Sequence, residues 1–403
     1  MLEHMTSENR PPWSAVLSLA ATVMVAFGVI LYGFSIFVTD AAAGSEFSKT
    51  VLSAGYGGSV VAGGLLAIPI GRRADRAGVR GITALGGVLG GCGMAIFALA
   101  SQPWHVLVAW WFFLGPAGAM MFYEVSFIAV DQWFATKQRG RALGAVTLIG
   151  GLAGIIFIPA TEWLVSTFGW RATSWALGAL VMSTAVATAT FALHTVAGPP
   201  RSLGSPSRQR GLIRRLLRDR RFLLHTAAMV LIFFAVQGIF AHRVAVFEEV
   251  GFDVTAVAWW AAAASALSLP GRWIAPLLAG RFGSINVQIV ASIVLALGAA
   301  AMVDGSTPWQ LVSHFVLFGG AFGAFLPLRA LTMAEWFSGD RYGATMGSQW
   351  MVVTLIGAAG PAVVGVMRDT AGDYTAATIV IISALGAGTA LLLAVNRSGF
   401  PAR

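Results

Sequence analysis

Charged side chains and cysteine are both scarce in this chain, and each absence excludes classes of protein. Only 11% of the 403 residues are charged, whereas about a quarter is usual for soluble domains. The single cysteine, Cys92, excludes an internal disulfide and a multi-cysteine metal site. The sequence also lacks a phosphate-binding P-loop, a dinucleotide fingerprint and a His–Cys metal spacing. We therefore expect no cofactor, no ATP-driven pump and no enzyme.

Apolar residues and glycine are abundant instead. Hydrophobic residues make up 57% of the chain, 48 residues are glycine, and the mean hydropathy is +0.77. Small residues let helices approach one another closely in lipid. The formal charge of +9 would suggest nucleic-acid binding in a soluble protein. Here the basic residues fall between apolar runs, so the expected partner is the lipid bilayer and not nucleic acid.

The apolar residues form twelve runs of the length that spans a bilayer. The first run lacks a small-residue cleavage site and is expected to be retained as a helix. The sequence therefore predicts an all-α membrane protein with twelve transmembrane helices. The runs cover residues 14–40, 47–70, 82–101, 104–130, 141–166, 172–197, 222–250, 254–280, 284–304, 308–334, 341–367 and 373–396.

The lysines and arginines predict the orientation of these spans. With both termini inside, twenty of the 26 basic residues are cytoplasmic and three are external. Cytoplasmic loops carry such an excess of basic residues. We therefore expect both termini on the cytoplasmic side of the cytoplasmic (inner) membrane. The other three, Arg243, Arg272 and Arg329, lie within the spans.

The two halves of the sequence resemble each other. The loop GRRADRAG that begins at Gly71 aligns with PLLAGRFG at an offset of 205, and Trp133-Phe134 aligns with Trp336-Phe337 at 203. A direct repeat of six spans predicts two pseudo-symmetric six-helix halves, with the ligand site between them. The predicted domains are an N-terminal half, residues 1–197, a basic cytoplasmic linker, 198–221, and a C-terminal half, 222–403.

Two motifs then carry a family resemblance. The loop Gly71-Arg-Arg-Ala-Asp75-Arg76-Ala-Gly78-Val-Arg80 resembles the signature loop of the major facilitator superfamily, although Arg73 and Val79 depart from it. Trp133-Phe134, followed by Lys137, Arg139-Gly140 and a glycine-rich stretch, resembles the fifth-helix motif of the bacterial monocarboxylate transporter and oxalate–formate antiporter group. The resemblance implies the major facilitator fold.

The first loop is expected to act as a gate. Asp75 lies where it can approach the positive N-terminus of span 11, near Tyr342, while Arg76 pairs with a nearby acid. Such contacts close one face of a carrier and break when that face opens. The predicted gating residues are Gly71, Asp75, Arg76, Gly78 and Arg80.

Arg272 is the first candidate binding residue. It lies eight residues before Gly280, about 12 Å into the span, where an unpaired guanidinium costs at least a few kcal/mol. The resemblance implies that this arginine of span 8 binds the substrate carboxylate. A packing pair with a neighbouring helix is the alternative. The aspartate that mammalian-type members carry four residues earlier is replaced by Ser268.

Glu124 is the predicted proton-coupling acid, because Ser268 cannot take that part and the resemblance places span 4 on the central path. A fixed salt bridge to Arg329 in span 10 is the alternative, since the two residues occupy near-equivalent places in the two halves. A pair that breaks on substrate binding reconciles the two interpretations.

Other polar residues in the spans are weaker candidates. Arg329, Tyr32, Tyr123, Gln237 and Gln349 are expected to contact substrate. Arg243 is expected in an outer vestibule, and an ion pair to Glu248 or Glu249 is the alternative. His314 is also expected in the outer vestibule, and packing within the helix bundle is its alternative.

Together these features predict a monomeric secondary carrier for a small organic anion that is coupled to protons or exchanges anions, and the resemblance implies a monocarboxylate. Three arginines against one well-placed acid in the spans favour an anionic substrate. The alternatives are a drug or metabolite efflux carrier of the same superfamily and a non-transporting membrane sensor.

Overall fold

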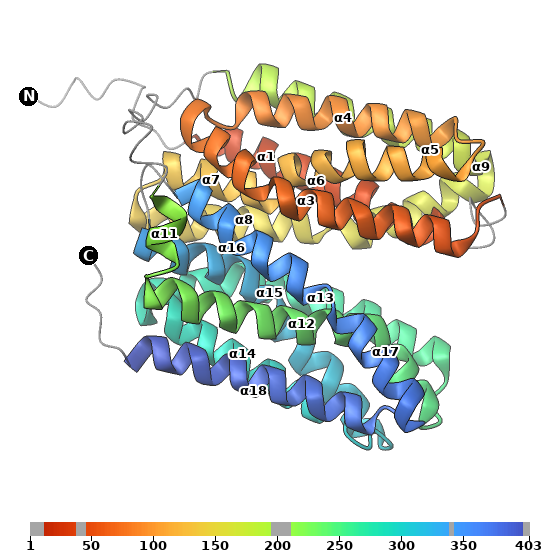
Figure 1. Ribbon diagram of the computed structural model, residues 1–403, viewed down its shortest axis with the longest axis vertical. Helices are drawn as coiled ribbons and strands as arrows, with labels where there is room; N and C mark the ends of the chain where they lie inside the picture. The colour runs from red at the N-terminus through yellow and green to blue at the C-terminus, as the bar shows by residue number, and fades with distance from the viewer. Residues whose placement is uncertain (1–11, 38–45, 195–210, 338–341, 398–403) are drawn as a thin grey trace, which may run out of the picture.

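A computed structural model describes residues 12–37, 46–194, 211–337 and 342–397, and throughout these ranges the regular structure is helical (Figure 1). An apolar chain in lipid has no water to satisfy its backbone, so helices, which pair their own N–H and C=O groups, are the expected solution. The all-α fold predicted from composition is confirmed.

Helices from the first half of the sequence follow one another closely. They are α1 (Trp13–Ala26), η2 (Phe27–Tyr32), α2 (Gly33–Phe37), α3 (Lys49–Ala77), α4 (Arg80–Ala98), α5 (Pro103–Val108), η4 (Ala109–Leu114), α6 (Gly115–Met121), α7 (Tyr123–Trp133), α8 (Thr136–Gly151), α9 (Ala153–Ala187) and η5 (Thr188–Ala192). Here η marks a short π-helical stretch.

Helices from the second half follow the linker. They are α11 (Leu212–Leu216), α12 (Arg220–Glu249), α13 (Val254–Phe282), α14 (Ser284–Ala300), α15 (Pro308–Phe337), α16 (Tyr342–Gly357), α17 (Gly360–Ala371) and α18 (Thr375–Arg397). Most of the predicted linker lies outside the described residues.

The described helices follow the twelve predicted runs. By length and composition, nine helices in the described ranges can cross a membrane. One of these, Gln138–Ala192, covers two runs, because the backbone turns at Gly169, whose φ of 78° suits glycine. Helix α13 and the shorter apolar α14 cover the two remaining runs, 254–280 and 284–304.

Several spans are interrupted where the sequence predicts continuous helices. Span 4 breaks at Phe122, which has extended backbone angles, so that α6 ends and α7 begins with Tyr123. Span 1 carries the π-helical stretch η2, which ends at Tyr32. Such interruptions at membrane depth occur where the backbone is buried in protein or lines a water-filled cavity.

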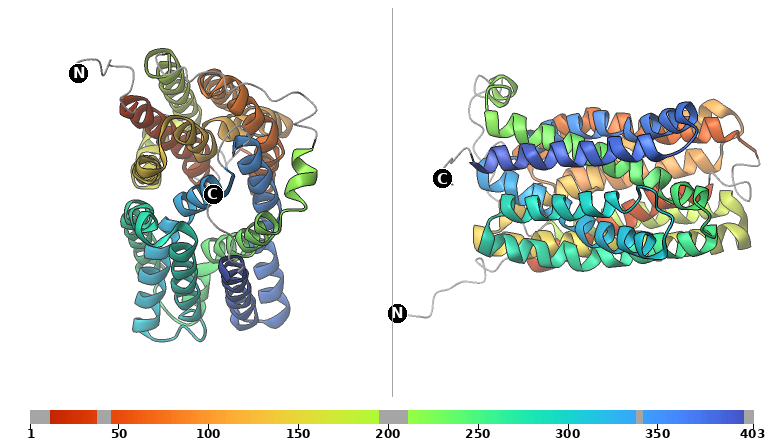
Figure 2. Two further views of the ribbon diagram at one scale, coloured as in Figure 1. Left: turned by 90° about the vertical axis from the view of Figure 1, so that its left-hand side faces the viewer. Right: turned by 90° about the horizontal axis from the view of Figure 1, so that it is seen from below.

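The two sets of helices form two groups that meet along α3–α16 and α8–α13. In Figure 1 the red-to-yellow helices lie above the green-to-blue ones, and Figure 2 shows the two groups end-on and from below. The C-terminal ends of α3 and α18 lie at the left, where α11 is also found (Figure 1).

Glycine makes these contacts possible. A Cβ at Gly71 would lie 2.1 Å from the carbonyl oxygen of Gly343, and one at Gly347 would lie 2.2 Å from that of Ala67. Both distances are far below any real contact, so helices α3 and α16 touch backbone to backbone. The many glycines therefore serve the close packing that composition suggests.

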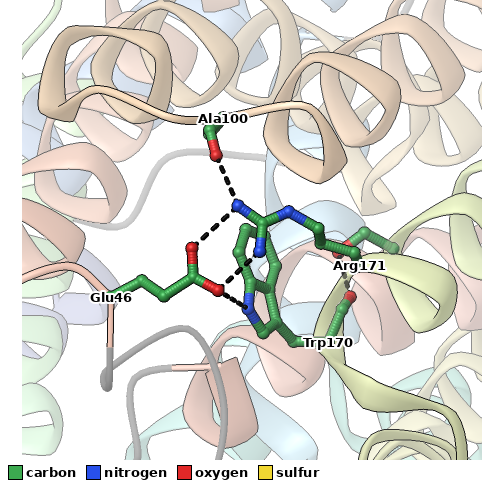
Figure 3. A network of polar contacts seen from close by, with 5 residues as sticks. Glu46, Ala100, Trp170 and Arg171 are labelled. Carbon is green, nitrogen blue, oxygen red and sulfur yellow. Dashed lines mark hydrogen bonds and ion pairs between the residues drawn. The ribbon is translucent and has the colours of Figure 1, made fainter.

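Close to the turn at Gly169, Arg171 joins three segments of the first helix group (Figure 3). Its guanidinium donates to Glu46 Oε1 at 2.5 Å and Oε2 at 2.7 Å, and to the carbonyl oxygen of Ala100 at 2.9 Å. It also lies 4.3 Å from the ring centre of Trp170, whose indole N–H donates to Glu46 at 3.2 Å. The Arg171 hydrogen bonds hold the pKa of Glu46 below its ordinary value of 4.5.

We expect Arg171→Gln to lower the Tm in detergent slightly at pH 7, since exposed ion pairs contribute about 0.2–1 kcal/mol. Because the folded-state pKa of Glu46 is lowered, this stabilisation is complete above pH 4.5 and disappears as the pH falls below it. Thermal unfolding of both proteins at pH 7 and at pH 3.5 measures the difference. Glu46→Gln is the matched variant and should lose the same amount. A difference that persists at low pH would contradict this origin.

Candidate functional site

The first turn of α7 places two polar side chains where the two helix groups meet. Tyr123 and Glu124 follow directly on the break at Phe122, so they stand at the N-terminus of α7. The positive end of the helix dipole favours a carboxylate at this position. The break therefore orients Glu124, and it is a feature that hydrophobic runs cannot predict.

Arg272 reaches from α13 to the first helix group. Its side chain is 7% exposed, and Nη1 donates to Tyr123 Oη at 3.0 Å and to the Thr147 carbonyl oxygen at 3.2 Å. A Cβ at Gly151 would lie 2.8 Å from Nε of Arg272, so glycine makes room for the guanidinium. Arg272 is thus buried where the two helix groups meet.

The guanidinium of Arg272 has an N–H group that makes no hydrogen bond. Its Nε is buried without a hydrogen-bond partner, and within the described ranges no acid lies at ion-pairing distance from it. Arginine presents its N–H groups as a planar fork that matches a carboxylate. Chemically, this position can bind a small carboxylate, with Tyr123 at its side.

Arg329 pairs with Glu124 across the two groups. Nη2 of Arg329 contacts Oε1 of Glu124, Nη1 donates to Gln349 Oε1 at 3.2 Å, and the guanidinium lies 4.6 Å from the ring centre of Trp350. The Arg329 side chain is 2% exposed and that of Glu124 is 14% exposed. The structure thus contains the salt bridge that was the alternative for Glu124, with the acid on its more accessible side.

Arg243 lies buried among aromatic rings. Its guanidinium is 4.7 Å from the ring centre of Phe240 and 5.5 Å from that of Phe315. The alternative ion pair with Glu248 or Glu249 does not form, and Glu249 instead contacts Arg368 at 3.3 Å. Tyr32 lies close enough to both Arg243 and Arg272 for their charges to act on its hydroxyl.

Two other candidates lie apart from these contacts. Gln237 on α12 is half-buried and has no hydrogen-bond partner in the described part of the chain. His314 is fully buried, with Nδ1 donating to the Gly298 carbonyl oxygen at 2.9 Å and its ring stacked on Phe318. The full burial of His314 favours the packing alternative over a place in an accessible vestibule.

The predicted gating loop contacts the N-terminus of α16. Asp75 accepts hydrogen bonds from the backbone N–H groups of Gly343 at 2.8 Å and Ala344 at 2.9 Å, as the sequence led us to expect. Gly78 ends α3 with a φ of 70°. Arg76 and Arg80 are exposed, and neither forms an ion pair with a described acid.

Sequence reasoning missed several residues that surround these contacts. Asp131 and Arg139 form an ion pair of 2.9 Å at the gating-loop end. Thr147, His225 and Gln288 are fully buried and hydrogen-bond to the site or to its neighbours. The available signal was that each is a polar residue within an apolar run, which marks a position that faces protein and not lipid.

Comparisons with known proteins identify the family of this chain. The family model of the Major Facilitator Superfamily matches residues 13–361. Monocarboxylate transporter 13 of Bos taurus is 26% identical over 390 residues, which cover 94% of this chain and 88% of that protein. The corresponding protein of Rattus norvegicus is also 26% identical, over 96% of this chain and 91% of its own.

Solved structures show the same fold. The transporter FucP in its outward conformation superposes with a TM-score of 0.78 at 13% identity, over 94% of this chain and 98% of that one. The human organic anion transporter MFSD10 gives a TM-score of 0.73 at 16% identity, over 96% and 100%. The chain is therefore a multi-pass membrane transporter of the major facilitator superfamily, and it resembles the monocarboxylate transporter group of that family.

Proposed function

We propose that this chain is a secondary carrier that moves a small organic anion, a monocarboxylate in the first instance, by alternating access. The observation that carries the proposal is Arg272, a buried guanidinium between the two helix groups with unused donors and no described acid beside it. A permanent charge at such a depth is costly unless an anion compensates it. The substrate carboxylate supplies that compensation, and Tyr123 contributes a hydroxyl.

The pair of Glu124 and Arg329 provides the coupling. When Glu124 takes up a proton, it loses its charge and releases Arg329. Arg329 then keeps its hydrogen bond to Gln349 and is available to the substrate. In the opposite direction, loss of the proton restores the pair and closes the cycle. The same pair supports anion exchange if the incoming anion, and not a proton, displaces Glu124 from Arg329.

The end of the molecule that carries Asp75 faces the cytoplasm in this proposal, in keeping with the distribution of basic residues. The contacts of Asp75 with α16 then close the inner face, and Tyr32, Arg243 and Gln237 lie on the approach from outside. The carrier acts as a monomer in the cytoplasmic membrane, and its two halves, 1–197 and 222–403, rock about the site.

Uptake by proteoliposomes tests the proposal. The purified chain is expected to accumulate at least one of labelled lactate, pyruvate, formate and oxalate, driven by a pH gradient or by an anion on the opposite side. Protein-free liposomes provide the background. Transport of a neutral or cationic compound with no competition from these anions would instead assign an efflux carrier. Anion binding without transport would assign a sensor.

A further inference from the structure

A chain of buried hydrogen bonds leads from Arg329 into the second helix group. Gln349 accepts from Arg329 with Oε1 at 3.2 Å and donates with Nε2 to Nδ1 of His225 at 2.8 Å. Nε2 of His225 then contacts Oε1 of Gln288 at 3.1 Å. Gln349, His225 and Gln288 are each 0% exposed. Three polar side chains thus stand between α12, α14 and α16 without access to water.

The chain continues to the surface. The Thr332 hydroxyl lies 3.4 Å from Oε1 of Gln288 and donates to the Ser284 hydroxyl at 2.9 Å. The Ser284 hydroxyl donates to Oε2 of Glu335 at 2.6 Å, and Glu335 is exposed. The buried part is therefore bounded by a cation, Arg329, at one end and by a surface carboxylate at the other.

The donors and acceptors allow one arrangement of the buried groups. A guanidinium only donates, so Gln349 must turn its oxygen to Arg329 and its NH₂ to His225. Nδ1 of His225 must then carry a lone pair, which leaves the proton on Nε2, and that N–H donates to Gln288. A protonated His225 would place an N–H against the Gln349 NH₂. The chain therefore requires neutral His225 with its proton on Nε2.

We propose that His225 is a positioning residue, which locks the Gln349 amide and through it holds Arg329 in the orientation that pairs with Glu124. The inference rests on the proposed function, in which that pair couples transport. The charged or titratable groups that face these hydrogen bonds are Arg329 and Glu335 from α15, Glu124 from α7, Tyr342 from α16 and the Asp131–Arg139 pair of α7 and α8. His225 hydrogen-bonds to Gln349 but to neither Arg272 nor Arg329, so it acts on Arg329 through Gln349.

A double-mutant cycle tests whether His225 fixes the Gln349 amide. His225→Leu removes the acceptor for Gln349, and Gln349→Leu removes the acceptor for Arg329. Because both changes interrupt the same series of hydrogen bonds, the Tm of the double variant should fall no further than that of the more destabilised single variant. Additive losses would overturn the proposal, since His225 would then act independently of Gln349.

The pH profile of uptake gives a readout that a merely structural residue would not move. With the Gln349 amide no longer fixed by His225, Arg329 holds the Glu124 carboxylate less well, so the pH of half-maximal proton-driven uptake should rise by about one unit in His225→Leu. His225→Asn keeps an acceptor near the position of Nδ1 and should restore most of the wild-type profile. Gln349→Leu carries the same expectation if His225→Leu is not recovered from membranes.

His242→Leu is the matched control. His242 lies on the same helix and hydrogen-bonds to Tyr374 at 3.2 Å and to the Pro361 carbonyl oxygen at 3.0 Å, so its loss should leave the pH profile unchanged. A Glu124→Gln variant separates the proposed coupling through Glu124 from the proposed positioning role of His225. If Glu124→Gln keeps the pH dependence, the proposed coupling fails, while the double-mutant cycle still tests the role of His225. If Glu124→Gln loses that dependence and His225→Leu does not shift the pH profile, only the role of His225 is wrong.

Discussion

Replacing Arg272 with alanine is expected to reduce uptake of the transported anion at least a hundredfold. A carboxylate bound by two charge-assisted hydrogen bonds gains about 3 kcal/mol or more, and every 1.4 kcal/mol is a factor of ten. Arg272→Lys should lose most of this as well, because an ammonium lacks the planar fork. Initial rates of labelled substrate uptake in proteoliposomes measure the effect, together with the thermal shift that the substrate produces.

The same variant should fold. Within the described residues no acid depends on Arg272, so its removal leaves no buried carboxylate without a partner. Arg281→Ala is the matched control, because Arg281 lies at the end of the same helix and is exposed there. Normal uptake by Arg272→Ala would show that the anchor lies elsewhere. An equal loss in Arg281→Ala would point to general charge and not to binding.

The fold was largely predictable from the sequence because lipid imposes few solutions. Twelve apolar runs, basic residues between them and an internal repeat lead to the superfamily fold, and the helices follow these runs. The breaks were not predictable: Phe122 is apolar and sits within an apolar run, so nothing local marks the start of α7 after it. Such interruptions depend on neighbouring helices that replace the lost backbone hydrogen bonds.

The site was predictable in its charges and not in its pairings. Arg272, Arg329 and Glu124 stand out because a charge in an apolar run needs a reason. Their partners lie far away in the sequence: Tyr123 and Thr147 for Arg272, Glu124 and Gln349 for Arg329. Uncharged residues such as His225 cost less in an apolar run and therefore draw less attention, although His225 hydrogen-bonds to both Gln349 and Gln288.

Removing Glu124 is expected to have two separable effects. Glu124→Ala leaves Arg329 buried without its partner, and breaking a buried pair in this way costs about 3–5 kcal/mol, so the Tm should fall by several degrees. Glu124→Gln keeps the shape and a hydrogen bond but no titratable group, so accumulation driven by a pH gradient should cease while exchange of labelled for unlabelled anion continues. Paired measurements of net uptake and exchange in the same proteoliposomes separate the two.

The double variant Glu124→Gln/Arg329→Gln decides between a pair that serves stability and one that serves coupling. Two neutral amides can hydrogen-bond where the ion pair stood, so much of the stability lost in Glu124→Ala should return. Proton-driven accumulation should not return, because neither residue then changes charge during the cycle. If the double variant regains both the Tm and the accumulation, the pair is dispensable and another group carries the proton. If Glu124→Gln alone already accumulates substrate normally, the salt bridge is a fixed strut between α7 and α15, which was the alternative for this acid from the start.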